Sequence, residues 1–120
     1  MKLLIIEDQG YIMERINDFL KNYPGIEVKE ADNAVKAREL LKTDPFDMVI
    51  TEVYIKGVSA LELNHLAREK NPDCCVIIIT SIDSADIAQK AVKEGAFDFI
   101  IRPAQMDKLE NLVKLYLSVK

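Results

Sequence analysis

The feature of the sequence that most constrains its fold is a regular alternation of short apolar runs with longer amphipathic stretches. Residues 75–80 are apolar and β-branched almost throughout, as is typical of a parallel strand buried on both faces. After a polar turn, Ile87, Ala88, Ala91 and Val92 recur at helical spacing. Because parallel strands need a crossover between them, the alternation predicts helices that connect neighbouring parallel strands.

Five such units are predicted along the chain. The strands are expected at residues 2–6, 26–31, 46–53, 75–80 and 97–101. Helices are expected at residues 10–21, from Asp32 or Asn33 to 42, over 61–67 and on towards Asn71, from Asp83 or Ser84 to near Gly95, and over 106–117. Right-handed crossovers then give an α/β, flavodoxin-like, doubly wound parallel sheet in three layers. Its expected strand order is 2-1-3-4-5, and residues 1–120 are expected to form a single domain.

Composition excludes several classes of protein. Hydrophobic residues make up 49% of the chain, which is enough for a packed core, and the net charge of -4 disfavours direct binding of nucleic acid. No apolar run approaches the length of a membrane span, and the N-terminus lacks the pattern of a signal peptide. The only cysteines, Cys74 and Cys75, are adjacent and are expected to be reduced thiols. We therefore expect a cytoplasmic protein that binds no membrane.

Polar residues gather where the predicted strands end. Glu7 and Asp8 follow the first strand, Glu52 lies at the end of the third, Thr80 ends the fourth and Arg102 follows the fifth. Doubly wound sheets bind ligands at this carboxyl edge. Three carboxylates at one edge need a cation, a basic side chain or a proton to coexist, and their oxygens suit Mg²⁺. Acids, a fixed positive charge and a hydroxyl are also what phosphoryl transfer to a carboxylate requires.

Over its whole length the chain resembles the receiver domain of two-component response regulators. The resemblance rests on four segments that occur in order at the spacing of a five-unit α/β domain, namely LLIIED, FDMVITEVYIKGVSALEL, VIIITS and GAFDFIIRP. It implies a module of phosphorelay signal transduction that acts through protein contacts and is not an enzyme. Its implied partners are a sensor kinase and an output domain or protein.

The resemblance also implies a metal site. Glu7 and Asp8 match the acidic pair that holds Mg²⁺ in the family. Glu52 stands at the position of the acceptor carboxylate, which is a further metal ligand. The backbone carbonyl of Tyr54 falls where the family offers a main-chain ligand. Mg²⁺ is therefore the expected cofactor.

Other positions match the phosphate site and the switch of the family. Thr80 matches the hydroxyl residue that contacts the phosphoryl group, and Phe99 matches an aromatic residue that changes rotamer on activation. Pro103 follows the basic position Arg102, where the family usually has a cis peptide bond. By the same resemblance, the fourth helix, the fifth strand and the fifth helix form a possible homodimer face.

Several departures from the family pattern fall at this site. Glu52 replaces the phosphoacceptor aspartate, Arg102 replaces a lysine, Lys56 replaces a usual proline and Ala60 a usual glycine. Glutamate is one methylene longer than aspartate, and in-line attack tolerates little misplacement. We therefore expect phosphorylation of Glu52 to be weak or absent. Its carboxylate is expected to pair with Thr80 and bidentately with Arg102, partly imitating the phosphorylated state.

Two other functions are compatible with these residues. One is a constitutive interaction adaptor whose site is vestigial. The other is a small Mg²⁺-dependent phosphatase, which is disfavoured because residues 7–10 lack the Asp-x-Asp motif of such enzymes. The accompanying departures at Lys56, Ala60 and Arg102 favour a naturally divergent receiver over an engineered change at Glu52. His65 has no metal-type neighbours in sequence and is expected to be exposed.

Overall fold

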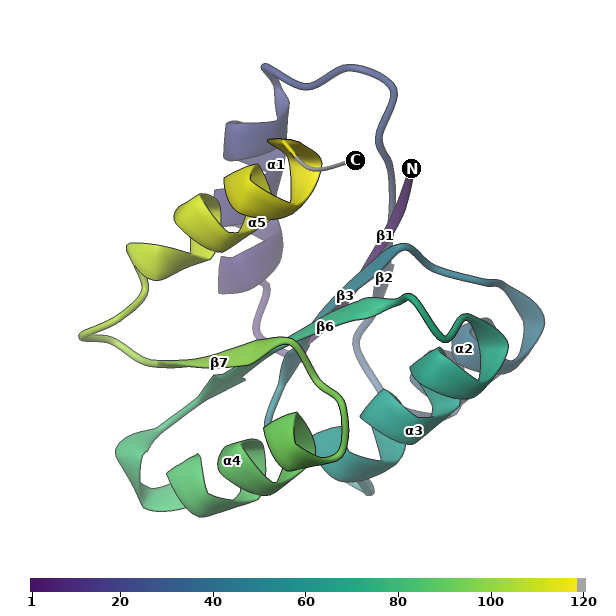
Figure 1. The fold of residues 1–120 in the computed structure, drawn as a ribbon, viewed down its shortest axis with the longest axis vertical. Coiled ribbons are helices and arrows are strands. Elements are labelled where there is room, and N and C mark those ends of the chain that lie inside the picture. The colour runs from purple at the N-terminus through teal and green to yellow at the C-terminus, as the bar shows by residue number, and fades with distance from the viewer. Residues whose placement is uncertain (119–120) are drawn as a thin grey trace.

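The computed structural model describes residues 1–118 as a three-layered α/β fold around a parallel sheet (Figure 1). The order of the strands in the sheet is β2-β1-β3-β6-β7, which is the predicted order 2-1-3-4-5 in terms of the five main strands. The bounds of these strands are β1 Lys2–Ile6, β2 Glu27–Ala31, β3 Met48–Glu52, β6 Cys75–Thr80 and β7 Asp98–Ile101. The predicted fold class is therefore confirmed.

Helices cover both faces of this sheet (Figure 1). Helices α1 (Tyr11–Leu20) and α5 (Lys108–Ser118) pack on one face, and α2 (Ala34–Thr43), α3 (Ala60–Lys70) and α4 (Ala85–Lys93) pack on the other. In β6, Ile77 and Ile79 face α1 and α5, whereas Val76 and Ile78 face the other three helices. Burial on both faces is the reason that β6 is apolar at nearly every position.

The structure departs from the sequence prediction mainly in the loops. Residues 54–59 were expected to be irregular, but they form a short antiparallel hairpin of β4 (Tyr54–Ile55) and β5 (Val58–Ser59). Two-residue strands are too short to produce a recognisable alternation in the sequence. A 3₁₀ turn, η1 (Ile82–Ser84), precedes α4. Of the two predicted caps of α2, Asn33 is the one used, since its side chain accepts a hydrogen bond of 2.9 Å from the Lys36 amide.

Three further expectations can be compared with the structure. Cys74 and Cys75 are free and buried, and burial raises the pKa of both thiols to about 12. His65 is exposed, as predicted, and its Nε2 lies 3.2 Å from Glu94 Oε1. Within residues 1–118, no helix is both long enough and apolar enough to span a membrane.

Gly95 ends α4 in a backbone conformation that side chains rarely adopt, with φ of +110°, and a Cβ placed there would lie 2.7 Å from Arg68 Nε. A left-handed backbone costs an ordinary residue about 1–2 kcal/mol, and Arg68 would also have to move from its hydrogen bond with the Cys74 carbonyl, so we expect Gly95→Ala to lower the free energy of unfolding by slightly more than that. Gly25→Ala is the matched control, because Gly25 has a φ of +93° and a Cβ placed there would meet no described atom within 4 Å beyond its chain neighbours. Urea unfolding of both variants measures the difference, and equal losses would contradict a steric contribution from Arg68.

Candidate functional site

The residues predicted to form a site do meet at the carboxyl edge of the sheet. Glu52 ends β3 and Thr80 ends β6, while Glu7 directly follows β1 and Arg102 directly follows β7. Glu7, Glu52 and Thr80 are buried, with 5%, 6% and 0% of their surfaces exposed. Asp8 is the exception, since it lies exposed in the loop after β1. The edge therefore contains two buried carboxylates, one of which, Glu52, is paired with a basic side chain.

Glu52 is at the centre of this arrangement. Its Oε1 accepts a hydrogen bond from the Tyr11 hydroxyl, and its Oε2 accepts one from Arg102 Nη1. Arg102 Nη1 also donates to the Tyr11 hydroxyl, at 3.2 Å. These three side chains, which we call the Glu52 triad, form a closed triangle of hydrogen bonds. Both oxygens of the Glu52 carboxylate are therefore engaged within the protein.

Within the triad, the positive charge of Arg102 balances the negative charge of Glu52. A buried carboxylate without a partner would be strongly destabilising, and the guanidinium of Arg102 supplies the opposite charge. Burial lowers the pKa of Arg102, but Glu52 and Tyr11 together outweigh that effect and leave it raised. Burial, and then the hydrogen bond and charge of Glu52, raise the pKa of the Tyr11 phenol. Arg102 is therefore charged at neutral pH, and Tyr11 keeps the proton that it donates.

The expected partners of Glu52 were wrong in two respects. Thr80 does not bond to Glu52, because its Oγ1 donates to the carbonyl of Ser81 at 3.1 Å. Arg102 does not form a bidentate pair with Glu52, because the Tyr11 hydroxyl occupies the second carboxylate oxygen. The predicted ion pair between Glu52 and Arg102 is nonetheless present.

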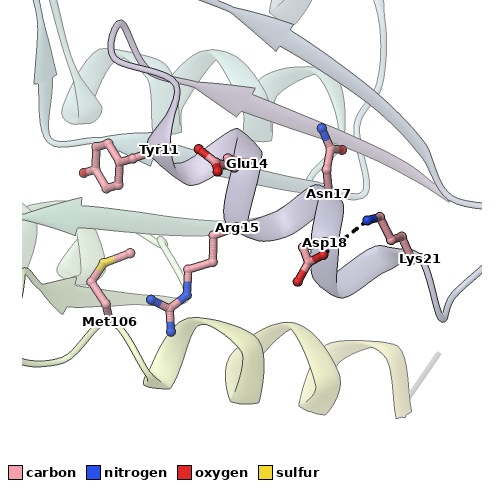
Figure 2. A pocket seen from close by; sticks show the side chains of 7 residues that line it. All are labelled: Tyr11, Glu14, Arg15, Asn17, Asp18, Lys21 and Met106. Atoms are coloured by element: carbon pink, nitrogen blue, oxygen red, sulfur yellow. Dashed lines mark hydrogen bonds and ion pairs between the residues drawn. The ribbon is translucent and has the colours of Figure 1, made fainter.

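Tyr11 is the site residue that sequence reasoning missed. It is the first residue of α1, after the N-cap Gly10, whose φ of +88° turns the chain from the loop into the helix. Figure 2 shows Tyr11 projecting from the first turn of α1. Tyr11, Arg15 and Met106 line the same groove, which runs along α1 and has a volume of about 810 Å³. The only signal in the sequence was its closeness to the acidic loop at residues 7–8.

Glu7 is turned towards the N-terminus of α1. Its Oε1 accepts a hydrogen bond of 2.6 Å from the backbone amide of Met13, which places a carboxylate at the positive end of the helix. Its Oε2 is buried and has no hydrogen-bond partner among residues 1–118. Burial is the main cause that raises the pKa of Glu7, and the charge of Glu52 adds to it, although backbone amides oppose the shift. Glu7 and Glu52 thus interact electrostatically without sharing a ligand.

The arrangement does not fit the Mg²⁺ site expected from Glu7, Asp8, Glu52 and the Tyr54 carbonyl. Mg²⁺ requires near-octahedral oxygen ligands. Both oxygens of Glu52 and one of Glu7 already accept hydrogen bonds, and Asp8 is exposed to solvent. In the part of the chain that the structure describes, no three His, Cys, Asp or Glu side chains are placed to hold a metal ion. Of the expected metal ligands, Glu52 and Glu7 are therefore committed to other partners, and Asp8 is exposed.

The remaining predicted positions lie in β7 or directly after it. The Arg102–Pro103 peptide is cis, as expected, and the Arg102 amide donates to the Thr80 carbonyl at 2.8 Å, which fixes Arg102 beside β6. Pro103 itself is exposed. Phe99 is half-buried and packs against the core on the α2, α3 and α4 face.

Comparisons with known proteins agree with this fold. The family model of the response regulator receiver domain matches residues 3–114. The chain is 36% identical over 109 residues to a cyclic di-GMP phosphodiesterase of Thermotoga maritima, covering 91% of this chain and 29% of the relative. It is 34% identical to the response regulator protein PilR of Pseudomonas aeruginosa, covering 99% of this chain and 26% of the relative. The chain thus spans less than a third of the length of these relatives.

Solved structures give the same result. A response regulator receiver domain protein from Clostridium thermocellum superposes with a TM-score of 0.79 at 27% identity, covering 98% of this chain and 94% of the other. The signal receiver domain of a DNA-binding response regulator from Colwellia psychrerythraea superposes with a TM-score of 0.81 at 26% identity, covering 98% of both chains. With its fold, its acidic edge and the family match over most of its length, the chain belongs to the response regulator receiver domain family.

Proposed function

We propose that this chain is an atypical receiver domain that signals through protein contacts and is not phosphorylated in the usual way. The observation that carries the proposal is the engagement of both Glu52 oxygens, one by Tyr11 and one by Arg102. Receiver domains of response regulators are generally not enzymes and act together with sensor kinases and output domains. The phosphodiesterase name of the Thermotoga relative belongs to a protein more than three times as long as the matched segment.

The chemical argument concerns the nucleophile. Phosphorylation of a carboxylate requires a free oxygen lone pair in line with the phosphorus atom of the donor. Glu52 is 6% exposed, and each of its oxygens accepts a hydrogen bond from a side chain of the triad. Breaking the contact with Arg102 would also leave the buried carboxylate without a counter-ion. Attack by Glu52 is therefore opposed by both geometry and electrostatics.

The same ion pair is the basis for a fixed signalling state. In the proposed mechanism, the carboxylate of Glu52 provides the negative charge that a phosphoryl group would otherwise bring to Arg102. Arg102 lies directly after β7 and its amide is bonded to the end of β6, so its position is linked to the two strands that border α4. The triad thereby holds this end of the sheet in one arrangement.

The contact surface proposed for protein partners consists of α4, β7 and α5. Phe97, between α4 and β7, is 46% exposed, and Leu115 on α5 is 53% exposed, so both apolar side chains are available to a partner. We propose that a second copy, a sensor kinase or an output domain contacts this face. The net charge of -4 supports protein partners over direct nucleic-acid binding. We also propose that residues 1–120 form one domain and that this domain is cytoplasmic.

The first test is a phosphorylation assay by intact mass, with a small phosphodonor and MgCl₂. We expect no phosphoryl adduct on the wild-type chain, because Glu52 is buried and both of its oxygens are held by hydrogen-bond donors. We expect an adduct on the double variant Glu52→Asp/Arg102→Lys, which restores both residues of the family pattern. Glu69→Asp, an exposed change of the same kind, is the control and should take no adduct. A stoichiometric adduct on the wild-type chain would overturn the proposal.

The second test is a double-mutant cycle of Glu52→Gln and Arg102→Met, measured by urea unfolding. We expect a coupling energy of about 1–3 kcal/mol, which is less than for a fully buried pair because the Arg102 side chain is 36% exposed. The matched control is the pair Arg38–Glu62, whose side chains are 35% and 43% exposed. Its coupling energy should be clearly smaller, because solvent screens an ion pair at the surface. Equal coupling energies in the two cycles would mean that the burial of Glu52 does not strengthen its interaction with Arg102.

The same variants distinguish a fixed signalling state from a vestigial site. If the triad sets the conformation, Arg102→Met should shift the backbone amide NMR signals of α4 and β7 as well as those near Glu52. Shifts confined to residues in contact with Arg102 would favour the constitutive interaction adaptor instead. Arg38→Met serves as the control for the loss of a surface charge.

A further inference from the structure

We propose that Arg102 is the built-in cation of this carboxylate site, and that Arg102 and Tyr11 together keep Mg²⁺ and similar divalent ions from binding there. This inference concerns the site of the proposed function, but it does not depend on whether Glu52 can be phosphorylated. It assigns the charge balance of the site to a side chain of the protein. Receiver domains typically use Mg²⁺ at the same place.

The first argument comes from the donor atoms. Glu52 lies between Tyr11 and Arg102 with one oxygen bonded to each. A carboxylate has about four lone-pair sites, and these two hydrogen bonds occupy one on each oxygen, so a metal ion at Glu52 would have to bind beside the donor hydrogen of Tyr11 or Arg102, or displace it. The structure thus leaves the central ligand of the expected metal site with no oxygen that is free of a donor.

The second argument comes from Glu7. Its Oε1 is held by the Met13 amide, which leaves Oε2 as the one buried carboxylate oxygen of the site that accepts no hydrogen bond among residues 1–118. The negative charge of Glu52 acts on Glu7, so the two carboxylates share one electrostatic environment. A single free oxygen, together with the exposed Asp8, is a poor substitute for the octahedral set that Mg²⁺ demands.

The third argument concerns charge and shape. A guanidinium keeps its positive charge at any pH at which the protein folds, and it presents several N–H donors from a rigid plane. Arg102 uses the same nitrogen, Nη1, for Glu52 and for the Tyr11 hydroxyl. A divalent ion that approached Glu52 would meet this fixed positive charge at hydrogen-bonding distance, where like charges repel strongly. Arg102 therefore neutralises the carboxylate and repels competing cations.

The experiment is a metal titration of the ¹⁵N-labelled full chain. Mn²⁺ is used at substoichiometric amounts to broaden nearby amide signals, and MgCl₂ is compared with NaCl at matched ionic strength. For the wild type we expect no selective broadening at Glu7, Asp8 or Glu52. For the double variant Arg102→Met/Tyr11→Phe, which frees both oxygens of Glu52, we expect selective broadening there and at least tenfold tighter Mn²⁺ binding. Arg38→Met, which removes a surface charge of the same kind, should behave as the wild type.

Each outcome bears on the inference. Selective broadening of the wild type at Glu7 and Glu52 would overturn it, and so would a double variant that folds but binds no better than the wild type. Should the double variant not fold, Tyr11→Phe takes its place, with a smaller gain in Mn²⁺ binding expected because it frees one oxygen of Glu52 while Arg102 stays on the other. A wild-type chain that binds Mn²⁺ yet takes no phosphoryl adduct overturns this inference alone, whereas an adduct overturns the proposed function.

Discussion

A carboxylate buried at the end of a parallel sheet needs a counter-charge, hydrogen-bond donors or a proton inside the protein. Glu52 meets this constraint through Arg102, and the rest of the site follows from it. Arg102 has to be held against the end of β6, which the hydrogen bond from its amide to the Thr80 carbonyl achieves. Tyr11 then completes the shell of donors from the first turn of α1. The doubly wound sheet makes this possible because its strands all end at one edge.

The sheet also explains why polar groups are confined to that edge. Both faces of β3 and β6 are covered, and every residue of these strands is buried. An unpaired polar side chain in the middle of either strand would cost free energy without any compensating partner. At the strand ends, by contrast, the loops and the first turn of α1 can supply donors. The amide of Met13 serves Glu7 in this way, and the phenol of Tyr11 serves Glu52.

The fold could be predicted from the sequence because each strand is a short apolar run and each helix has an apolar stripe. The strand order was confirmed, and so was the meeting of Glu7, Glu52, Thr80 and Arg102 at one edge. Hydrogen-bond partners could not be predicted in the same way. The Thr80 hydroxyl turns to a neighbouring carbonyl, and Glu52 turns to Tyr11, a residue outside any strand end. Which hydrogen-bond partner a side chain takes depends on its rotamer, and the periodicity of the sequence carries no information about rotamers.

The ion pair between Glu52 and Arg102 bears on how long a signal from this domain lasts. An acyl phosphate is a high-energy bond that hydrolyses. A receiver that is phosphorylated on a carboxylate therefore returns to its unphosphorylated state, and its signal ends. A carboxylate paired with a guanidinium stores no such bond and does not decay. If the domain signals in this state, the duration of its signal is the lifetime of the protein and of its complexes. The quantity that a cell would have to control is then the number of copies of the chain.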